Sequence, residues 1–136
     1  MTDPGDAGGA GSATGPSRQL GRLTGRLTVE GRVRVVALSG ELDFDSAPLL
    51  RSLFQEALDI DGARVVLDAS RLTFCDSTGL NALVVARRAA TERGSVVSVA
   101  APTPAMARVL AMSGVDTVIA VHPTRAEAVE QAREVG

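Results

Sequence analysis

Apolar residues near the start of the folded region follow the two-residue alternation that is typical of strands. One such segment runs from Arg22 to Val29 and a second from Arg32 to Ser39, with Glu30-Gly31 between them. Two strand-like segments joined by a short glycine-containing link predict a hairpin with a two-residue turn. The folded region therefore begins with an antiparallel strand pair.

The apolar spacing then changes to the helical one. Ser46 predicts an N-cap and Pro48 lies in the expected first turn, after which the apolar residues trace one helical stripe. The later segments are a strand at Val65–Leu67, a helix over Thr78–Arg93, a strand over Ser95–Ala100, a helix from Thr103-Pro104 to Gly114, a strand over Thr117–Val121 and a capped helix over Thr124–Arg133. The order ββαβαβαβα predicts an α/β fold with about four helices and a mixed, mainly parallel sheet.

The N-terminal segment has a different composition from the rest. Residues 1–20 are rich in glycine and polar residues and include Pro4 and Pro16. Such a segment buries too little apolar surface to offset the entropy lost on ordering. We therefore expect a disordered tail over residues 1–20 and a single domain over residues 21–136.

Composition narrows the classes of function. The chain has 136 residues, 45% of them hydrophobic, which suits one domain with a modest core. All 14 basic residues are arginines, so lysine Schiff-base chemistry and a lysine-containing phosphate loop are excluded. The net charge of -2, with arginines spread along the chain, argues against direct binding of nucleic acid.

Neither a membrane segment nor a secretion signal is evident. No apolar run approaches the roughly 18 residues of a spanning helix, and the N-terminus is polar where a signal peptide is apolar. The single cysteine, Cys75, cannot form an internal disulfide. We expect a cytoplasmic protein.

Two hydroxyls follow a carboxylate at the predicted start of the second helix, in Asp76, Ser77 and Thr78. Unpaired N–H groups and the helix dipole favour negative charge there, so a phosphoryl group on Ser77 would be tolerated. Local chemistry also fits ordinary capping residues, and taken alone it favours that simpler interpretation.

The surrounding residues resemble a known family. Phe74-Cys75-Asp76-Ser77-Thr78-Gly79-Leu80 is similar to the signature of the STAS family of anti-sigma factor antagonists. Ser39-Gly40-Glu41-Leu42-Asp43 and Ala111-Met112-Ser113-Gly114-Val115 resemble two further segments of that family. The three motifs occur in the family's order, and the resemblance covers about residues 27–122.

The resemblance implies roles for particular residues. Ser77 corresponds to the phosphoacceptor, with Thr78 as the alternative acceptor, and Asp43 resembles a loop carboxylate near it. The expected partner-binding residues are Asp43, Asp76, Ser77, Thr78, Gly79 and Asn81. Thr78 and Asn81 stand where the family often has Ser and Gly, and neither difference removes the acceptor.

The resemblance also implies a partner-switching cycle. The unmodified protein would bind an anti-sigma factor that is also a serine kinase, which frees a sigma factor. Phosphorylation of Ser77 would end the binding, and a metal-dependent serine phosphatase would restore it. No cofactor is expected, and we expect a monomer or weak dimer.

Alternative functions remain open at this point. The same fold would suit a scaffold subunit of a stress-signalling complex or an accessory domain of a transporter. A hydrolase would use Ser77 or Cys75 as nucleophile and His122 as base, but the Gly-x-Ser-x-Gly elbow is absent. One histidine and one cysteine cannot form a closed zinc site, so we expect neither catalysis nor a bound metal.

Overall fold

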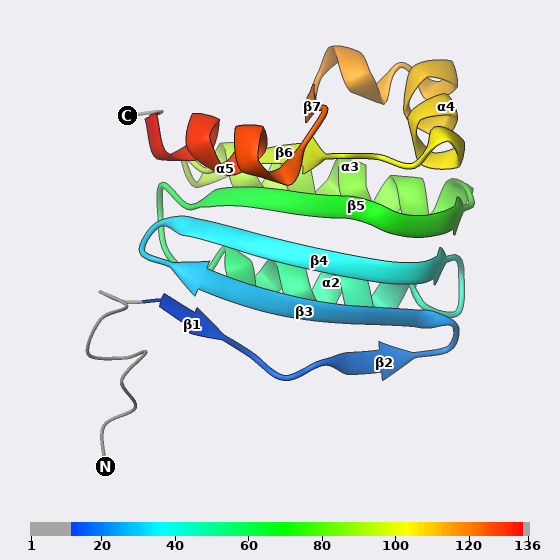
Figure 1. The fold of residues 1–136 in the computed structure, drawn as a ribbon, viewed down its shortest axis with the longest axis horizontal. Coiled ribbons are helices and arrows are strands. Elements are labelled where there is room, and N and C mark those ends of the chain that lie inside the picture. The colour runs from blue at the N-terminus through cyan, green and yellow to red at the C-terminus, as the bar shows by residue number, and fades with distance from the viewer. Residues whose placement is uncertain (1–11, 135–136) are drawn as a thin grey trace.

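A seven-stranded sheet forms the centre of the computed structural model, which describes residues 12–134 (Figure 1). The strands are β1 (Ser12–Thr14), β2 (Arg18–Leu20), β3 (Leu23–Glu30), β4 (Val33–Leu42), β5 (Arg64–Cys75), β6 (Val96–Ala100) and β7 (Ala120–His122). The helices are α2 (Ala47–Ala57), α3 (Ser77–Glu92), α4 (Pro104–Ser113) and α5 (Arg125–Glu134), with a 3-10 turn η1 (Val115–Thr117).

The sheet is mixed. Strands β1 and β2 both pair with β3, and β3 pairs with β4, all antiparallel. From β4 the sheet continues through β5 and β6 to β7 in parallel pairs. This confirms the predicted α/β class, the N-terminal hairpin and the mixed sheet, in which the parallel pairs of the described strands equal the antiparallel ones in number.

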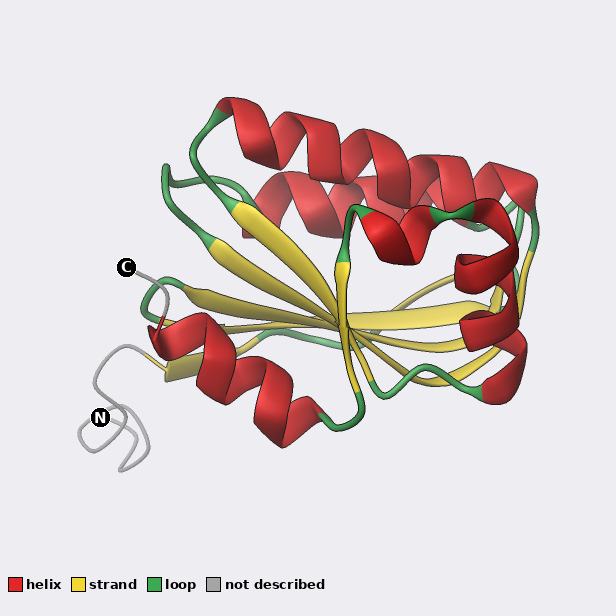
Figure 2. Cartoon of the chain, turned by 90° about the horizontal axis from the view of Figure 1, so that it is seen from above, coloured by secondary structure: helices red, strands yellow, loops and turns green. Residues whose placement is uncertain are grey.

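Helices cover the two faces of the sheet unequally. Figure 2 shows α2 and α3 side by side on one face and α5 alone on the other. The larger core lies under α2 and α3 and includes Leu42, Leu53 and Leu83. A smaller cluster around Val33 and Val35 lies under α5. Strand β4 is apolar on both faces because helices cover both, as is usual for the central strands of an α/β sheet.

The hairpin turn is one residue later than predicted. Glu30 pairs with Val33, so Gly31 and Arg32 form the turn, where Glu30-Gly31 was expected. Gly31 has a φ of 62°, the left-handed conformation that glycine adopts at least cost.

The expectation of a disordered tail is wrong for residues 12–20, and residues 1–11 lie outside the described residues. Strands β1 and β2 pair with the outer edge of β3, whose N–H and C=O groups would otherwise lack partners. The Arg18 guanidinium lies 2.7 Å from a carboxylate oxygen of Glu56 on α2. Backbone pairing and this ion pair therefore order a segment with little apolar surface.

The last strand also differs from its prediction. Residues Val115–Thr117 form the 3-10 turn η1, and β7 begins at Ala120 where a strand over Thr117–Val121 was expected. Gly114 ends α4 with a φ of 78°, as predicted, and Val115 and Ile119 then turn into the core. These two buried side chains hold the chain in the turn before it can extend.

Candidate functional site

The junction between β5 and α3 is fixed by the side chain of Asp76. Asp76 is the N-cap residue of α3, and its Oδ1 accepts a hydrogen bond from the backbone N–H of Gly79 at 2.9 Å. Its own N–H donates to the carbonyl oxygen of Leu42 at 3.1 Å, which ties the junction to the end of β4. Ser77 is therefore the first residue of the helix, and the bonds of Asp76 to Gly79 and to Leu42 fix its position.

Gly79 allows α3 to approach β4 closely. A Cβ atom at this position would lie 2.6 Å from Cγ of Leu42 and 2.9 Å from its carbonyl oxygen. Both distances are shorter than real carbon contacts, so any side chain here would push the helix away from the strand. Gly79 is thus a packing residue, and it is buried.

The loop after β4 is locked to the same junction. The Asp43 N–H donates to Oγ of Ser46 at 2.9 Å, and Asp43 Oδ1 accepts from the Ser46 N–H at 3.0 Å. The next residue, Phe44, donates its N–H to Oδ2 of Asp76 at 3.2 Å. Two aspartates far apart in sequence, Asp43 and Asp76, therefore come together beside the start of α3.

Ser46 holds the predicted N-cap position of α2 but does not cap the helix with its side chain. Its Oγ bonds within the loop, next to Asp43 and the carbonyl oxygen of Glu41. The hydroxyl stabilises the loop that carries Asp43, so the predicted capping bond is wrong.

The predicted site residues of α3 differ in exposure. Ser77 and Asn81 are exposed and, four residues apart, share one face of the helix, whereas Thr78 is half-buried. The Ser77 hydroxyl is thus the more accessible of the two candidate acceptors. All six predicted site residues lie at or near this junction.

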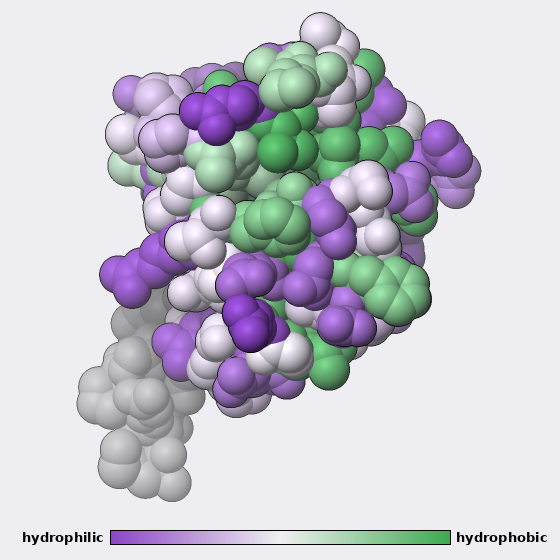
Figure 3. Space-filling view, turned by 90° about the vertical axis from the view of Figure 1, so that its right-hand side faces the viewer, coloured by the Kyte–Doolittle hydropathy of each residue, from purple (hydrophilic) through white to green (hydrophobic). Residues whose placement is uncertain are grey.

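Two exposed phenylalanines, Phe44 and Phe74, flank the junction, and neither is among the site residues predicted from the sequence. Phe44 is 72% exposed and Phe74 is 48% exposed, while the third phenylalanine of the chain, Phe54, is buried. Figure 3 faces this end of the molecule and shows apolar side chains gathered among polar ones. The amino-acid composition could have pointed to them, because two of the three aromatic residues of the chain lie within or beside the motifs.

The amino-acid sequence around this junction matches a known protein family. The family model described as "Mlab, STAS domain" matches residues 23–121. The chain belongs to the STAS domain family. The match spans β3 to β7, so it contains both the Asp43 loop and the start of α3.

The relatives of this STAS domain include anti-sigma factor antagonists and, at lower identity, transporter proteins. An anti-sigma F factor antagonist from Paenibacillus polymyxa is 28% identical over 100 residues, covering 73% of this chain and 86% of the relative. The crystal structure of an anti-sigma factor antagonist from Mycobacterium paratuberculosis superposes with a TM-score of 0.74 at 27% identity, covering 82% of this chain and 95% of that one. The unphosphorylated antagonist SpoIIAA shares the fold, with a TM-score of 0.69 at 24% identity, covering 82% and 98%.

The hydrolase arrangement is not present in this STAS domain. Ala100 on β6 pairs with Asp68 on one side and with His122 on the other, so His122 lies two strands from β5. Cys75 is also seven residues further along β5 than Asp68, which is a separation of about 23 Å along the strand at roughly 3.3 Å per residue. His122 therefore cannot act as a base for Cys75 or for Ser77, which follows it.

Cys75 is a buried free thiol. Burial, and secondarily the charge of Asp76, raise its pKa from 9.0 to about 11. The reactive thiolate is therefore scarce at neutral pH. Within residues 12–134 no group of three or more potential metal ligands occurs, and none of the helices there is long and apolar enough to cross a membrane.

Proposed function

We propose that this chain is an anti-sigma factor antagonist whose binding is switched off by phosphorylation of Ser77. In its unmodified form it binds an anti-sigma factor that is also a serine kinase, and this releases a sigma factor. The two relatives at 27% and 28% identity, both described as anti-sigma factor antagonists, support this assignment. Such a partner would place the protein in the cytoplasm, where sigma factors act.

The observation that carries the proposal is the position of Ser77. Its exposed hydroxyl stands in the first turn of α3, directly after Asp76 and on the same end of the molecule as Phe44 and Phe74. A kinase can reach this hydroxyl without unfolding the domain. A partner that covers the two phenylalanines would lie over the same hydroxyl, so modification and binding would compete for one surface.

A phosphate here would act by local repulsion. It adds about -1.5 to -2 charge next to Asp76 and beside the Asp43 loop, where two carboxylates already lie. The N-terminus of α3 tolerates the charge, because free N–H groups and the helix dipole stabilise an anion there. The fold therefore persists while the binding surface becomes strongly acidic, and a metal-dependent serine phosphatase would reverse the change.

Thr78 is the alternative acceptor, and its exposure makes it the weaker candidate. It is half-buried against the junction, so a kinase would have to displace neighbouring atoms to reach its hydroxyl. We expect phosphorylation at Ser77 alone.

The assignment is tested by incubating the chain with candidate anti-sigma factor kinases and ATP, followed by site mapping with mass spectrometry. Ser77→Ala should abolish the added phosphate, and Thr78→Ala should retain it. Ser70→Ala is the matched control, because Ser70 is an exposed serine away from the junction. Phosphate found only on other residues of the parent chain would contradict the proposal.

A further inference from the structure

The face of the sheet that carries α5 is only partly covered. Helix α5 packs on Val33 and Val35, and Figure 1 shows no helix over β3 or the second half of β4 on the same face. A polar depression of about 440 Å³ lies there. We call it the arginine-lined hollow, and its lining residues include Thr24, Arg26, Ser39, Ser70, Arg71 and Arg125.

Strand register explains the shape of this hollow. Ala37 on the central strand β4 lies between Arg26 on β3 and Asp68 on β5, and Ser39 pairs with Arg71 on β5. Small residues thus form the floor, and long ones rise on the strands beside it. Adjacent strands lie about 4.8 Å apart, so the backbones of Arg26 and Arg71 are separated by roughly 10 to 12 Å.

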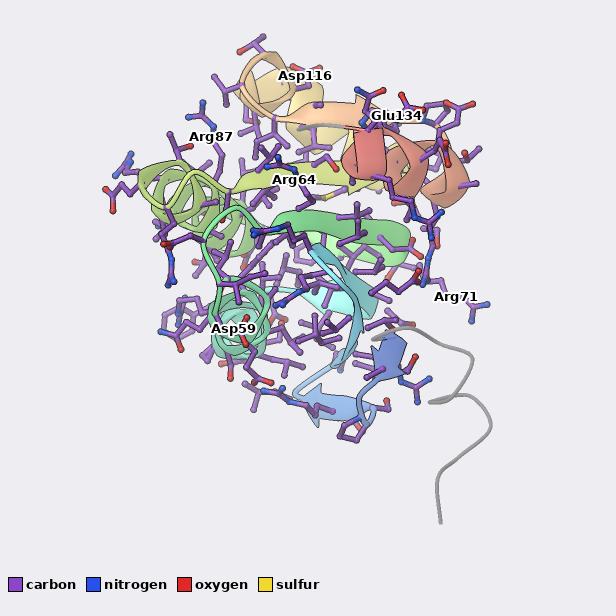
Figure 4. The ribbon with its side chains drawn as sticks, turned by 90° about the vertical axis from the view of Figure 1, so that its left-hand side faces the viewer. Asp59, Arg64, Arg71, Arg87, Asp116 and Glu134 are labelled. Carbon is purple, nitrogen blue, oxygen red and sulfur yellow. The ribbon has the colours of Figure 1, made fainter. Side chains whose placement is uncertain are left out.

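More arginines than acidic residues line the hollow, so its net charge is positive. Asp68 is the one acidic residue that lines it, and both of its oxygens are occupied. Its Oδ1 accepts from the Ser70 N–H at 3.0 Å, and its Oδ2 lies 3.2 Å from the Arg125 guanidinium. Within residues 12–134, no carboxylate pairs with Arg26 or Arg71. Figure 4 shows the Arg71 side chain projecting away from the sheet on the α5 side.

We propose that the arginine-lined hollow is a binding site for a small molecule that carries phosphate groups. A guanidinium donates two parallel hydrogen bonds to phosphate oxygens, which makes Arg26 and Arg71 suitable for the two ends of such a molecule. Hydroxyls of Thr24, Ser39 and Ser70 supply further donors between them. The volume lies within the range of small-molecule sites.

The arrangement of polar groups in the hollow favours a compact anion over a protein surface. The floor residues Ala37 and Ser39 lie on β4, between the strands that carry Arg26 and Arg71. A flat acidic surface would meet the arginine side chains and leave the Ser39 hydroxyl unused, whereas a small anion can reach both. The site is separate from Ser77, since none of its lining residues is among those of the α3 junction, although both use β4 and β5.

Titration of the full chain with inorganic pyrophosphate, followed by amide chemical shifts at constant ionic strength, tests the proposal. We expect saturable shifts confined to residues near 24–26, 37–39 and 68–71. Arg26→Gln and Arg71→Gln should each weaken the binding about tenfold. Both side chains are exposed, so the fold should be kept, and Arg108→Gln on α4 is the matched control with another exposed arginine.

Several results would overturn the site. These are shifts that do not saturate, shifts centred elsewhere, or an equal loss of affinity in Arg108→Gln. Equal affinity for citrate would indicate general attraction of anions and would contradict recognition of phosphate. A concentration-dependent dimer in light scattering that masks the shifts would show that a second copy covers the face, which also contradicts the proposal.

Discussion

The start of α3 and the arginine-lined hollow treat a phosphate group in opposite ways. At the start of α3, Asp76 and the Asp43 loop place carboxylates beside an exposed hydroxyl and two exposed phenylalanines. In the hollow, Arg26 and Arg71 flank small floor residues, and neither arginine pairs with a carboxylate of residues 12–134. A phosphate is thus a source of repulsion in one region and a ligand in the other. The difference lies in the charged side chains, which are carboxylates at the start of α3 and guanidinium groups in the hollow.

The two regions also differ in how the chain builds them. The α3 junction depends on a few hydrogen bonds from Asp76, Asp43 and Ser46 across distant loops, together with the close packing at Gly79. The hollow depends on regular strand register and on α5 covering only part of one face. Substitutions should therefore separate the two, because neither region shares a supporting contact with the other.

Substitution of the two exposed phenylalanines should have the largest effect on kinase binding while leaving the hollow unchanged. Phe44→Ala and Phe74→Ala should each weaken binding of the anti-sigma factor kinase by about 10- to 30-fold, because buried aromatic anchors dominate most interfaces. Calorimetric titration measures the affinity. Val121→Ala, which truncates an exposed apolar residue on β7, should change it little. If both alanine variants bound the kinase like the parent while Ser77 was still modified, the phenylalanines would not belong to the interface.

A charge at Ser77 should have the next largest effect. We expect Ser77→Asp to weaken kinase binding about tenfold, since one carboxylate imitates a phosphate incompletely, and Ser77→Ala to bind nearly as the parent does. Pyrophosphate titration of the hollow should give the same affinity in both variants. Tight kinase binding by Ser77→Asp would refute the repulsion argument.

Two helix caps permit a matched test of the junction. Asp76→Ala and Thr103→Ala each remove a side chain that accepts a first-turn N–H, so each should lower the free energy of unfolding by about 1 to 2 kcal/mol in urea. Asp76→Ala alone should also alter kinase binding, because only Asp76 holds Phe44. Equal effects of the two variants on binding would show that the junction acts through stability only.

The smallest effect is expected at Cys75. Because burial raises its pKa to about 11, labelling by iodoacetamide should be very slow at pH 8 and should increase as the pH approaches that value. In the unfolded chain the thiol ionises near its ordinary pKa of 9.0, so the stability that the protonated buried thiol contributes is lost as the pH rises from about 9 to about 11. Rapid labelling at pH 7 by the folded chain would show that the thiol is activated.

Much of the fold follows from local pattern, and the exceptions have physical causes. The helices at Ala47–Ala57 and Ser77–Glu92 agree with the apolar stripes read from the sequence, and the second of them also has a side-chain cap, at Asp76. The strands Ser12–Thr14 and Arg18–Leu20 could not be predicted, because their order comes from the edge of β3 and from Glu56, which lie further along the chain. Likewise β7 begins late because Val115 and Ile119 fill core positions that no local pattern specifies.

The candidate site was predicted in part. The motif around Ser77 placed the hydroxyl correctly at the helix start, and Asp76 caps the helix as its position suggested. The bond between Phe44 and Asp76 and the loop bonds of Ser46 could not be foreseen, because they form between segments that the fold brings together. The arginine-lined hollow was also not foreseen, since Arg26 and Arg71 become neighbours only through the pairing of each strand with β4.

The most direct measurement compares kinase binding by the unmodified chain with binding by the same chain carrying one phosphate on Ser77, confirmed by intact mass. Amide exchange of both forms should accompany it. We expect the phosphorylated form to bind about 100-fold more weakly, with exchange changed only around the start of α3 and the Asp43 loop. Unchanged affinity, or a loss of protection across the whole sheet, would contradict a local switch at Ser77.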